Sequence, residues 1–263
     1  MYVSGVDLQS KKFVFIGGLY RSGKSIMFKL LKKHPNISGL YNPYLKGEDQ
    51  RDEGQHSQSV YPKGADMDNS FGFDTSAHLD ESSKLATAEH AKRLFKDWKE
   101  YWDTEKPVLL ENSPPNLVRT RYLQSLFPNT YFIIVMRHPI PASYETMKWS
   151  DYGLDAMLKR WLSCHEQFLR DSSLIQNVIV VKYEKMVSNP RKEIDRIFDF
   201  IGLKGDVEGA NIKNEYNNKY FDLFKNSPML RYNYFPLTWL FKIYTYIRFE
   251  ERIRKFGYSL INM

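Results

Sequence analysis

Residues 18–25 have the types and spacing of an anion-binding turn. The segment reads GLYRSGKS and stands between an apolar run at 12–17 and a helical pattern at 22–33. In that setting, successive backbone N–H groups can point at one anion, and the helix N-terminus adds partial positive charge. Arg21 and Lys24 add two full charges. The segment matches the G-x-x-x-x-G-K-[ST] pattern of nucleoside triphosphate sites, with a purely structural turn as the alternative.

The residues that end the neighbouring predicted strands disfavour a metal-dependent site. A triphosphate site usually places an aspartate at a strand end to hold Mg²⁺. Here the corresponding positions are Glu111, Arg137 and Lys182, of which two are basic. A basic strand end repels a metal ion and attracts a further phosphate. The pattern therefore predicts a multiply anionic nucleotide that is bound without an obligatory cation.

Alternating strands and helices must position these groups. The strands are predicted from short apolar runs and the helices from apolar residues at helical spacing. The strands are 12–17, 107–111, 130–136 and 177–181, and the helices are 22–33, 84–102, 116–126, 153–171 and 190–201. Apolar strands that alternate with helices predict a parallel sheet covered on both faces. Residues 34–82 show no sustained period, and so long an irregular segment is usually functional or disordered.

No linker composition divides the chain, so we predict one α/β domain over residues 1–263. The domain is expected to have three layers, a central parallel sheet and a P-loop-like phosphate loop. Its core would cover about residues 12–203, and residues 204–263 would form a helical, aromatic-rich C-terminal extension. That extension either packs on the domain, covers an acceptor, lies on acidic lipid or forms a dimer face.

Composition limits the class of protein. Of the 263 residues, 42% are hydrophobic and 26% are charged, which is ordinary for a soluble globular protein. The formal net charge of +7 suits an anionic partner. The single cysteine, Cys164, excludes an internal disulfide and a cysteine-cluster metal site. Without a secretory signal or an apolar run of about 18 residues, the chain is expected to be cytoplasmic.

Three segments, in this order, resemble the sulfotransferases that use 3′-phosphoadenosine 5′-phosphosulfate (PAPS). FIGGLYRSGKSIMFKLLKKHP (15–35) resembles their 5′-phosphosulfate loop with its helix. FPNTYFIIVMRHPIPASY (127–144) is similar to the strand whose terminal Arg-x-Pro holds the 3′-phosphate. VIVVKYEKMVSNPRKEIDRIFDFIGL (178–203) looks like the next strand–helix unit. The family is structurally related to the P-loop kinases, which accounts for the formal match of the first motif.

The resemblance implies a reaction and a set of site residues. The reaction would move a sulfuryl group directly from PAPS to a hydroxyl or amine of a small molecule, with no metal and no nucleic acid. Arg21 would stabilise charge on the leaving oxygen, Arg137 would pair with the 3′-phosphate, and Tyr183 would reach the nucleotide. The remaining phosphate contacts would come from Ser22, Gly23, Lys24, Ser25 and Ile26.

The chain departs from the family pattern at three positions. Lys24 replaces the usual threonine of the loop, and Asn112 stands where many members carry a lysine, which Lys24 would then replace. Eight residues after the strand-end arginine the family usually has a serine, whereas this chain has Glu145. Ser143 is the expected substitute, with Thr146 as the second choice. Lys219, Lys225 and Arg231 are candidates for a basic segment over the nucleotide.

An alcohol acceptor needs a general base, because its proton leaves as the S–O bond forms. Glu48 and Asp49 lie about as far beyond His34-Pro35 as the glutamate base of some carbohydrate sulfotransferases. Glu111 and His56 are the alternatives, and each of the four is otherwise a solvated surface residue. Residues 46–81 contain nine acids and three Lys or Arg residues. The segment is either a solvated acidic loop or, as the functional alternative, the site of a cationic or amine-bearing acceptor.

Two other functions remain open at this stage. A P-loop kinase that uses ATP and Mg²⁺ is favoured by Lys24-Ser25 alone. A nucleotide-binding relative without catalysis is suggested by Asn112, where the family lysine is missing.

Overall fold

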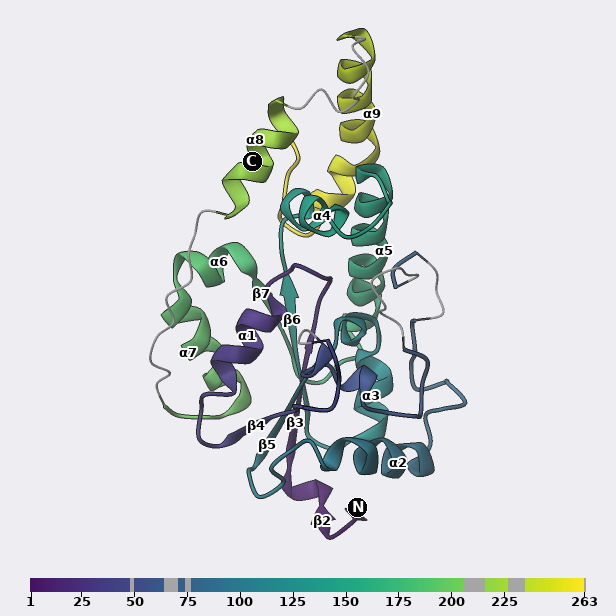
Figure 1. Cartoon of the computed structure of the whole chain (residues 1–263), viewed down its shortest axis with the longest axis vertical. Helices are drawn as coiled ribbons and strands as arrows, with labels where there is room; N and C mark the ends of the chain where they lie inside the picture. The colour runs from purple at the N-terminus through teal and green to yellow at the C-terminus, as the bar shows by residue number, and fades with distance from the viewer. Residues whose placement is uncertain (48–49, 64–70, 74–76, 206–215, 227–234, 263) are drawn as a thin grey trace.

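A five-stranded parallel sheet forms the centre of the molecule, with strand order β4-β5-β3-β6-β7 (Figure 1). The computed structural model describes residues 1–47, 50–63, 71–73, 77–205, 216–226 and 235–262. The strands are β3 (Lys12–Gly17), β4 (Ile37–Gly39), β5 (Val108–Asn112), β6 (Thr130–Met136) and β7 (Val178–Lys182). A short antiparallel hairpin, β1 (Tyr2–Val3) and β2 (Val6–Asp7), precedes them.

Helices cover both faces of the sheet, so the predicted three-layer α/β class is confirmed (Figure 1). Successive residues of β3 point to opposite faces, as strand geometry requires. Phe13 and Phe15 pack in one apolar cluster with the helices α2 (Ala88–Lys99), α3 (Thr120–Leu126) and α5 (Leu154–Ser172). Val14 and Ile16 pack in the other cluster with α1 (Lys24–Leu31), α6 (Tyr183–Ser188) and α7 (Pro190–Ile201). Burial on both faces explains why the strands are nearly continuous apolar runs.

The five predicted helices occur in the predicted order with shifted ends, and α4 (Pro139–Met147) and α6 lie between them without having been predicted. The helices are α1 (Lys24–Leu31), α2 (Ala88–Lys99), α3 (Thr120–Leu126), α4 (Pro139–Met147), α5 (Leu154–Ser172), α6 (Tyr183–Ser188), α7 (Pro190–Ile201), α8 (Tyr216–Asn226) and α9 (Phe235–Arg254). The predicted helix 84–102 begins later, because Thr87 accepts the backbone N–H of His90 and caps α2. The predicted helix 116–126 is interrupted at Arg119, whose φ of −126° separates α3 from the 3₁₀ helix η4 (Pro114–Val118).

Part of the predicted irregular segment 34–82 is ordered against the sheet. Ile37–Gly39 forms the edge strand β4, which is too short to show a two-residue period. Further along, Gly54–His56 forms the 3₁₀ helix η3, whose backbone is held by buried groups. The N–H of Gly54 donates to Glu111, and its carbonyl accepts from Trp98 at 2.9 Å. Because of these contacts, η3 stands at the end of β5.

The order in which strands are added to the sheet reverses at β3, which creates a ligand-binding position at the carboxyl edge of the sheet. From β3 the chain passes to β4 and β5 on one side and then to β6 and β7 on the other. Ligands of open α/β sheets bind beyond the carboxyl ends of the strands at such a switch point.

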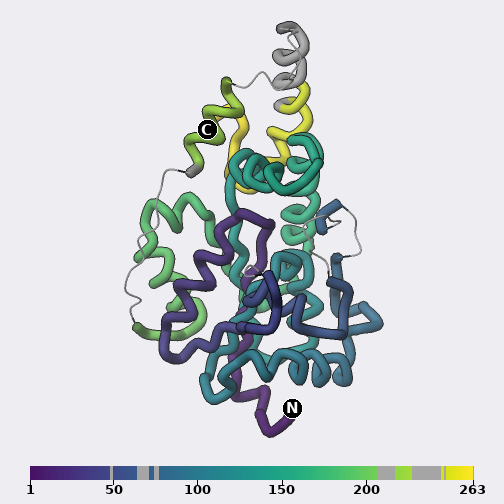
Figure 2. Tube along the Cα trace, viewed as in Figure 1, coloured from purple at the N-terminus to yellow at the C-terminus, as the bar shows by residue number. Residues whose placement is uncertain are grey.

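Figure 2 shows the N-terminus at the opposite end of the long axis from α8 and α9. In the part of the chain that is described, no helix could cross a membrane.

Candidate functional site

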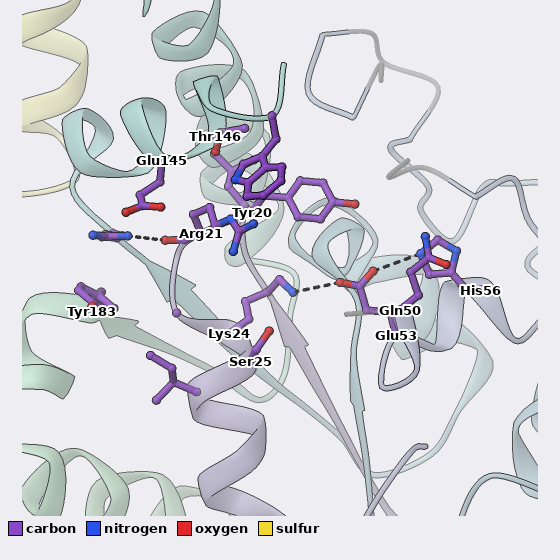
Figure 3. A pocket seen from close by; sticks show the side chains of 15 residues that line it. Tyr20, Arg21, Lys24, Ser25, Gln50, Glu53, His56, Glu145, Thr146 and Tyr183 are labelled. Carbon is purple, nitrogen blue, oxygen red and sulfur yellow. Dashed lines mark hydrogen bonds and ion pairs between the residues drawn. The ribbon is translucent and has the colours of Figure 1, made fainter. Parts of the chain in front are cut away.

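A cavity of about 430 Å³ lies at the carboxyl ends of β3 and β6. It brings together the turn after β3, the end of β6, the helix α4 and the segment around η3 (Figure 3). The lining residues are Leu19, Tyr20, Arg21, Gly23, Lys24, Ser25, Ile26, Gln50, Glu53, His56, Arg137, Glu145, Thr146, Trp149 and Tyr183. Segments that are up to 164 positions apart in sequence therefore share one site.

The turn between β3 and α1 leaves polar groups ready for an anion. Gly23 precedes α1 with φ of 101° and caps it without a side-chain hydrogen bond. A Cβ at Gly23 would lie 2.6 Å from the ring of Tyr183, so only glycine fits there. The hydroxyl of Ser22 is buried and has no hydrogen-bond partner among the described residues. Uncapped N–H groups and an orphaned hydroxyl at a helix N-terminus are suited to a phosphate or sulfate.

The Lys24 side chain is almost fully buried at the floor of the cavity. Its Nζ lies 3.4 Å from Oδ1 of Asn112 and 3.8 Å from Oε1 of Glu53. Asn112 thus contacts the ammonium group of Lys24 at the end of β5. That Lys24 stands in for the lysine expected at the Asn112 position stays a prediction.

Arg137 follows β6 and is 5% exposed. Its Nη1 donates to the carbonyl of Arg21 at 2.8 Å, and the guanidinium lies 4.5 Å from the Tyr183 ring centroid. Nε and Nη2 both donate to Oδ1 of Asn217. Burial lowers the pKa of the Arg137 guanidinium from its ordinary value. All hydrogen bonds that it makes to described residues go to neutral oxygens, so its charge suits an anionic ligand.

The carboxylate of Glu53 and the imidazole of His56 lie beyond the Lys24 ammonium group, on the side away from Arg21 (Figure 3). The Glu53 side chain is 7% exposed, and its Oε2 accepts from Nε2 of Gln55 at 2.7 Å. Nε2 of His56 lies 3.4 Å from the same oxygen. The structure therefore places His56, a predicted base candidate, in the cavity. Glu53 and Gln50 were not singled out, because nothing in the sequence separates Glu53 from the eight other acids around it.

The other base candidates are placed differently. Glu111 is fully buried and does not line the cavity; its carboxylate accepts from Gly54 N at 2.7 Å, from Ser113 Oγ and from Asn116 Nδ2. Burial raises its pKa to about 6 despite these bonds. Both oxygens are engaged in holding η3 and η4 to β5. Glu48 and Asp49 lie outside the described residues.

Glu145, at the position where the sequence resemblance leads one to expect a serine, lines the cavity. The Glu145 carboxylate accepts from the hydroxyl of Tyr220 and lies 3.5 Å from Nζ of Lys148. Ser143 is buried and lines a small neighbouring void of about 10 Å³ instead. Thr146 lines both spaces, and its hydroxyl donates to the carbonyl of Ala142.

Comparison with known proteins agrees with the geometry. Residues 14–207 match the model of the sulfotransferase family. A sulfotransferase domain from the olefin synthase of Synechococcus PCC 7002 is 18% identical, with a TM-score of 0.51 over 99% of this chain and 100% of that one. A sulfotransferase domain from the curacin biosynthetic pathway is 15% identical, with a TM-score of 0.50 over 95% and 99%. At these identities the two structures show a shared fold.

The family match extends from β3 to the end of α7. It includes the turn after β3, the strand end that carries Arg137, and the unit that carries Tyr183. Because one continuous match covers these elements and the fold agrees, the chain belongs to the sulfotransferase family.

Proposed function

We propose that this sulfotransferase moves a sulfuryl group from PAPS to a hydroxyl or amine of a small-molecule acceptor. The observation that carries the proposal is the order of charged groups along one cavity (Figure 3). Arg137 donates to the carbonyl of Arg21 in the turn, Lys24 of the same turn contacts Glu53, and Glu53 contacts His56. An in-line transfer needs this order of nucleotide anchor, reacting group and acceptor.

The turn after β3 fits the 5′ end of the donor. The buried hydroxyl of Ser22 and the uncapped start of α1 offer donors without protein partners among the described residues. The residues that would hold this end are Arg21, Ser22, Gly23, Lys24, Ser25 and Ile26. Arg137 would hold the 3′-phosphate, and the ring of Tyr183 would support the guanidinium through a cation–π contact. When bound, PAPS would supply the sulfuryl group and leave as adenosine 3′,5′-bisphosphate.

Two cations of this chain would stabilise the transfer. Negative charge develops on the oxygen that joins sulfur to the leaving nucleotide, and a fixed cation lowers the barrier most where charge develops. Lys24 is held in place by Asn112 and Glu53, so its ammonium group needs little reorganisation. Arg21 lies at the rim, with its guanidinium 5.5 Å from the Trp149 ring centroid. We assign the stabilisation of the negative charge on the leaving oxygen to Lys24 and Arg21, and the proposal includes no metal ion.

Glu53 and His56 would take the acceptor proton. As the new S–O or S–N bond forms, the proton passes to this pair and the bond to the leaving oxygen breaks. The carboxylate is oriented by Gln55, and the imidazole stands beside it. Glu53 and Tyr20 line the same cavity and also suit a cationic acceptor, because a carboxylate and an aromatic face both attract cations.

Calorimetry tests the donor. We expect adenosine 3′,5′-bisphosphate to bind without metal and more tightly than adenosine 5′-phosphate. Tighter binding of ATP that requires Mg²⁺ would favour the P-loop kinase that the Lys24-Ser25 pair also fits.

An acceptor screen tests the reaction. Small alcohols and amines, cationic ones included, are incubated with PAPS and protein, and products are found by a mass gain of one sulfuryl group. We expect turnover of at least one amine-bearing acceptor. Nucleotide binding without turnover on any acceptor would identify a catalytically inactive relative.

A further inference from the structure

The side chain of Asn217, on α8, accepts hydrogen bonds from the Arg137 guanidinium. Nε and Nη2 of Arg137 both donate to Oδ1 of Asn217, at 2.9 and 2.8 Å. These two N–H groups belong to the planar fork with which arginine binds phosphate or carboxylate oxygens. The carboxamide oxygen of Asn217 therefore stands where an oxygen of a bound anion would stand.

The Asn217 carboxamide is held at both ends. Its Nδ2 donates to Oε1 of Glu184 at 3.0 Å, and Glu184 also accepts from His138 N and from the hydroxyl of Tyr258. Arginine offers only donors and a carboxylate only acceptors, so the amide can face them in one orientation. Asn217 thus presents its oxygen to Arg137 from a fixed position.

A second contact from α8 reaches the same end of the cavity. The hydroxyl of Tyr220 donates to Glu145 and accepts from Nζ of Lys148 at 2.6 Å. Burial by itself would raise the pKa of Glu145, but the Tyr220 hydrogen bond and the charges of Lys148 and Arg137 outweigh it and lower the pKa. The carboxylate at the position usually held by serine is therefore charged and bound to α8.

Apolar contacts dock α8 on the domain beside α4. The Phe221 ring meets the His138 ring edge-on with centroids 4.8 Å apart, and Tyr220 stacks on Tyr144 at 6.1 Å. Phe224 is fully buried. The polar contacts to Arg137 and Glu145 are therefore held by packing, which makes them persistent competitors for a ligand.

We propose that α8 is an inhibitory latch in which Asn217 competes with the donor's 3′-phosphate for Arg137. The inference rests on the proposed function, because it takes Arg137 as the phosphate ligand. A neutral carboxamide bonds a guanidinium more weakly than a phosphate does, so the donor can displace it. The apparent nucleotide affinity is then the intrinsic affinity multiplied by the fraction of molecules in which Arg137 is not bound to Asn217.

The test measures nucleotide affinity in Asn217→Ala. By calorimetry, we expect adenosine 3′,5′-bisphosphate to bind about threefold to tenfold more tightly than to the wild type. Adenosine 5′-phosphate should bind equally to both, because it lacks the group that competes. In an Arg137→Ala background, Asn217→Ala should bring no gain, which makes the effect a coupling between the two residues.

Two further variants control the experiment. Asn218→Ala changes the same residue type at an exposed position of α8 and should bind like the wild type. Asn217→Ser, with a shorter polar side chain, should repeat the gain if Asn217→Ala does not fold. An unchanged or weaker affinity in the folded Asn217 variants overturns the latch, while a wild-type preference for the bisphosphate keeps the proposed function. A wild type without that preference overturns both.

Discussion

Arg137 is the residue on which the nucleotide assignment depends most. We expect Arg137→Ala to weaken adenosine 3′,5′-bisphosphate binding about tenfold to a hundredfold, because a charged contact contributes about 1.5–3 kcal/mol. Arg137→Lys should also lose affinity, since lysine keeps the charge but not the fork. Calorimetry with the bisphosphate and with adenosine 5′-phosphate gives the answer. A variant that keeps the full wild-type preference for the 3′-phosphate would remove Arg137 from this role.

Arg21 and Lys24 are expected to act mainly in the transition state. Arg21→Ala and Lys24→Ala should lower kcat more than they weaken nucleotide binding, because charge on the leaving oxygen develops only during transfer. Lys29→Ala, at an exposed position of α1, the helix that begins with Lys24, is the matched control. Steady-state kinetics are compared with calorimetric affinities. Weaker binding with saturated turnover unchanged would contradict a catalytic role.

Glu53 joins the candidate bases on structural grounds. If it takes the acceptor proton, Glu53→Gln should remove the acidic limb of the rate–pH profile and leave nucleotide affinity nearly unchanged. The exposed Glu105→Gln variant should keep the wild-type profile. If His56→Asn removes the limb and Glu53→Gln does not, the imidazole is the base and Glu53 orients it.

At the scale of the elements, Glu111 joins η3 and η4 to the end of β5. Its buried carboxyl has a pKa of about 6 against an ordinary value of 4.5, so the folded state holds the proton more tightly. A raised carboxyl pKa contributes stability below the unfolded value, and this contribution is lost as the pH rises through 6.

Glu111→Gln should therefore remove one pH-dependent contribution to the free energy of unfolding. From pH 4 to 7, we expect the wild type to lose about 2 kcal/mol relative to the variant. Urea denaturation of both proteins across this range measures the difference, and a constant offset from altered hydrogen bonds does not affect its slope. A difference that is flat with pH would show that Glu111 is not shifted upward.

For the whole molecule, nucleotide binding should appear as thermal stabilisation. At a hundredfold excess over Kd, a ligand specific for the folded state adds about 2.7 kcal/mol, which raises Tm by about 5–10 °C for a chain of this length. Adenosine 3′,5′-bisphosphate should produce this shift without metal. The same concentration of adenosine 5′-phosphate should produce less, and equal shifts would argue against a site for the 3′-phosphate.

The sequence by itself determined the fold class and the family. Apolar strands and periodic helices depend on contacts that repeat every few residues, so the order of the longer elements from β3 to α7 follows from local patterns. The turn after β3 and the arginine after β6 lie at ends of such elements, which is why their place at one edge of the sheet could be predicted. α4 and α6 were missed between these landmarks because they are short and directly follow strands.

Only the tertiary structure decided which acids face the cavity. Residues 46–81 carry nine acids without a period to orient them, and the buried bonds of Gly54 to Glu111 and Trp98 fix how η3 is presented. Glu53 consequently meets Lys24 although 29 positions separate them, and Glu111, an alternative base in the sequence analysis, is turned inward. Asn217 meets Arg137 across 80 positions. Such contacts depend on the packing of whole elements, and no local spacing encodes them.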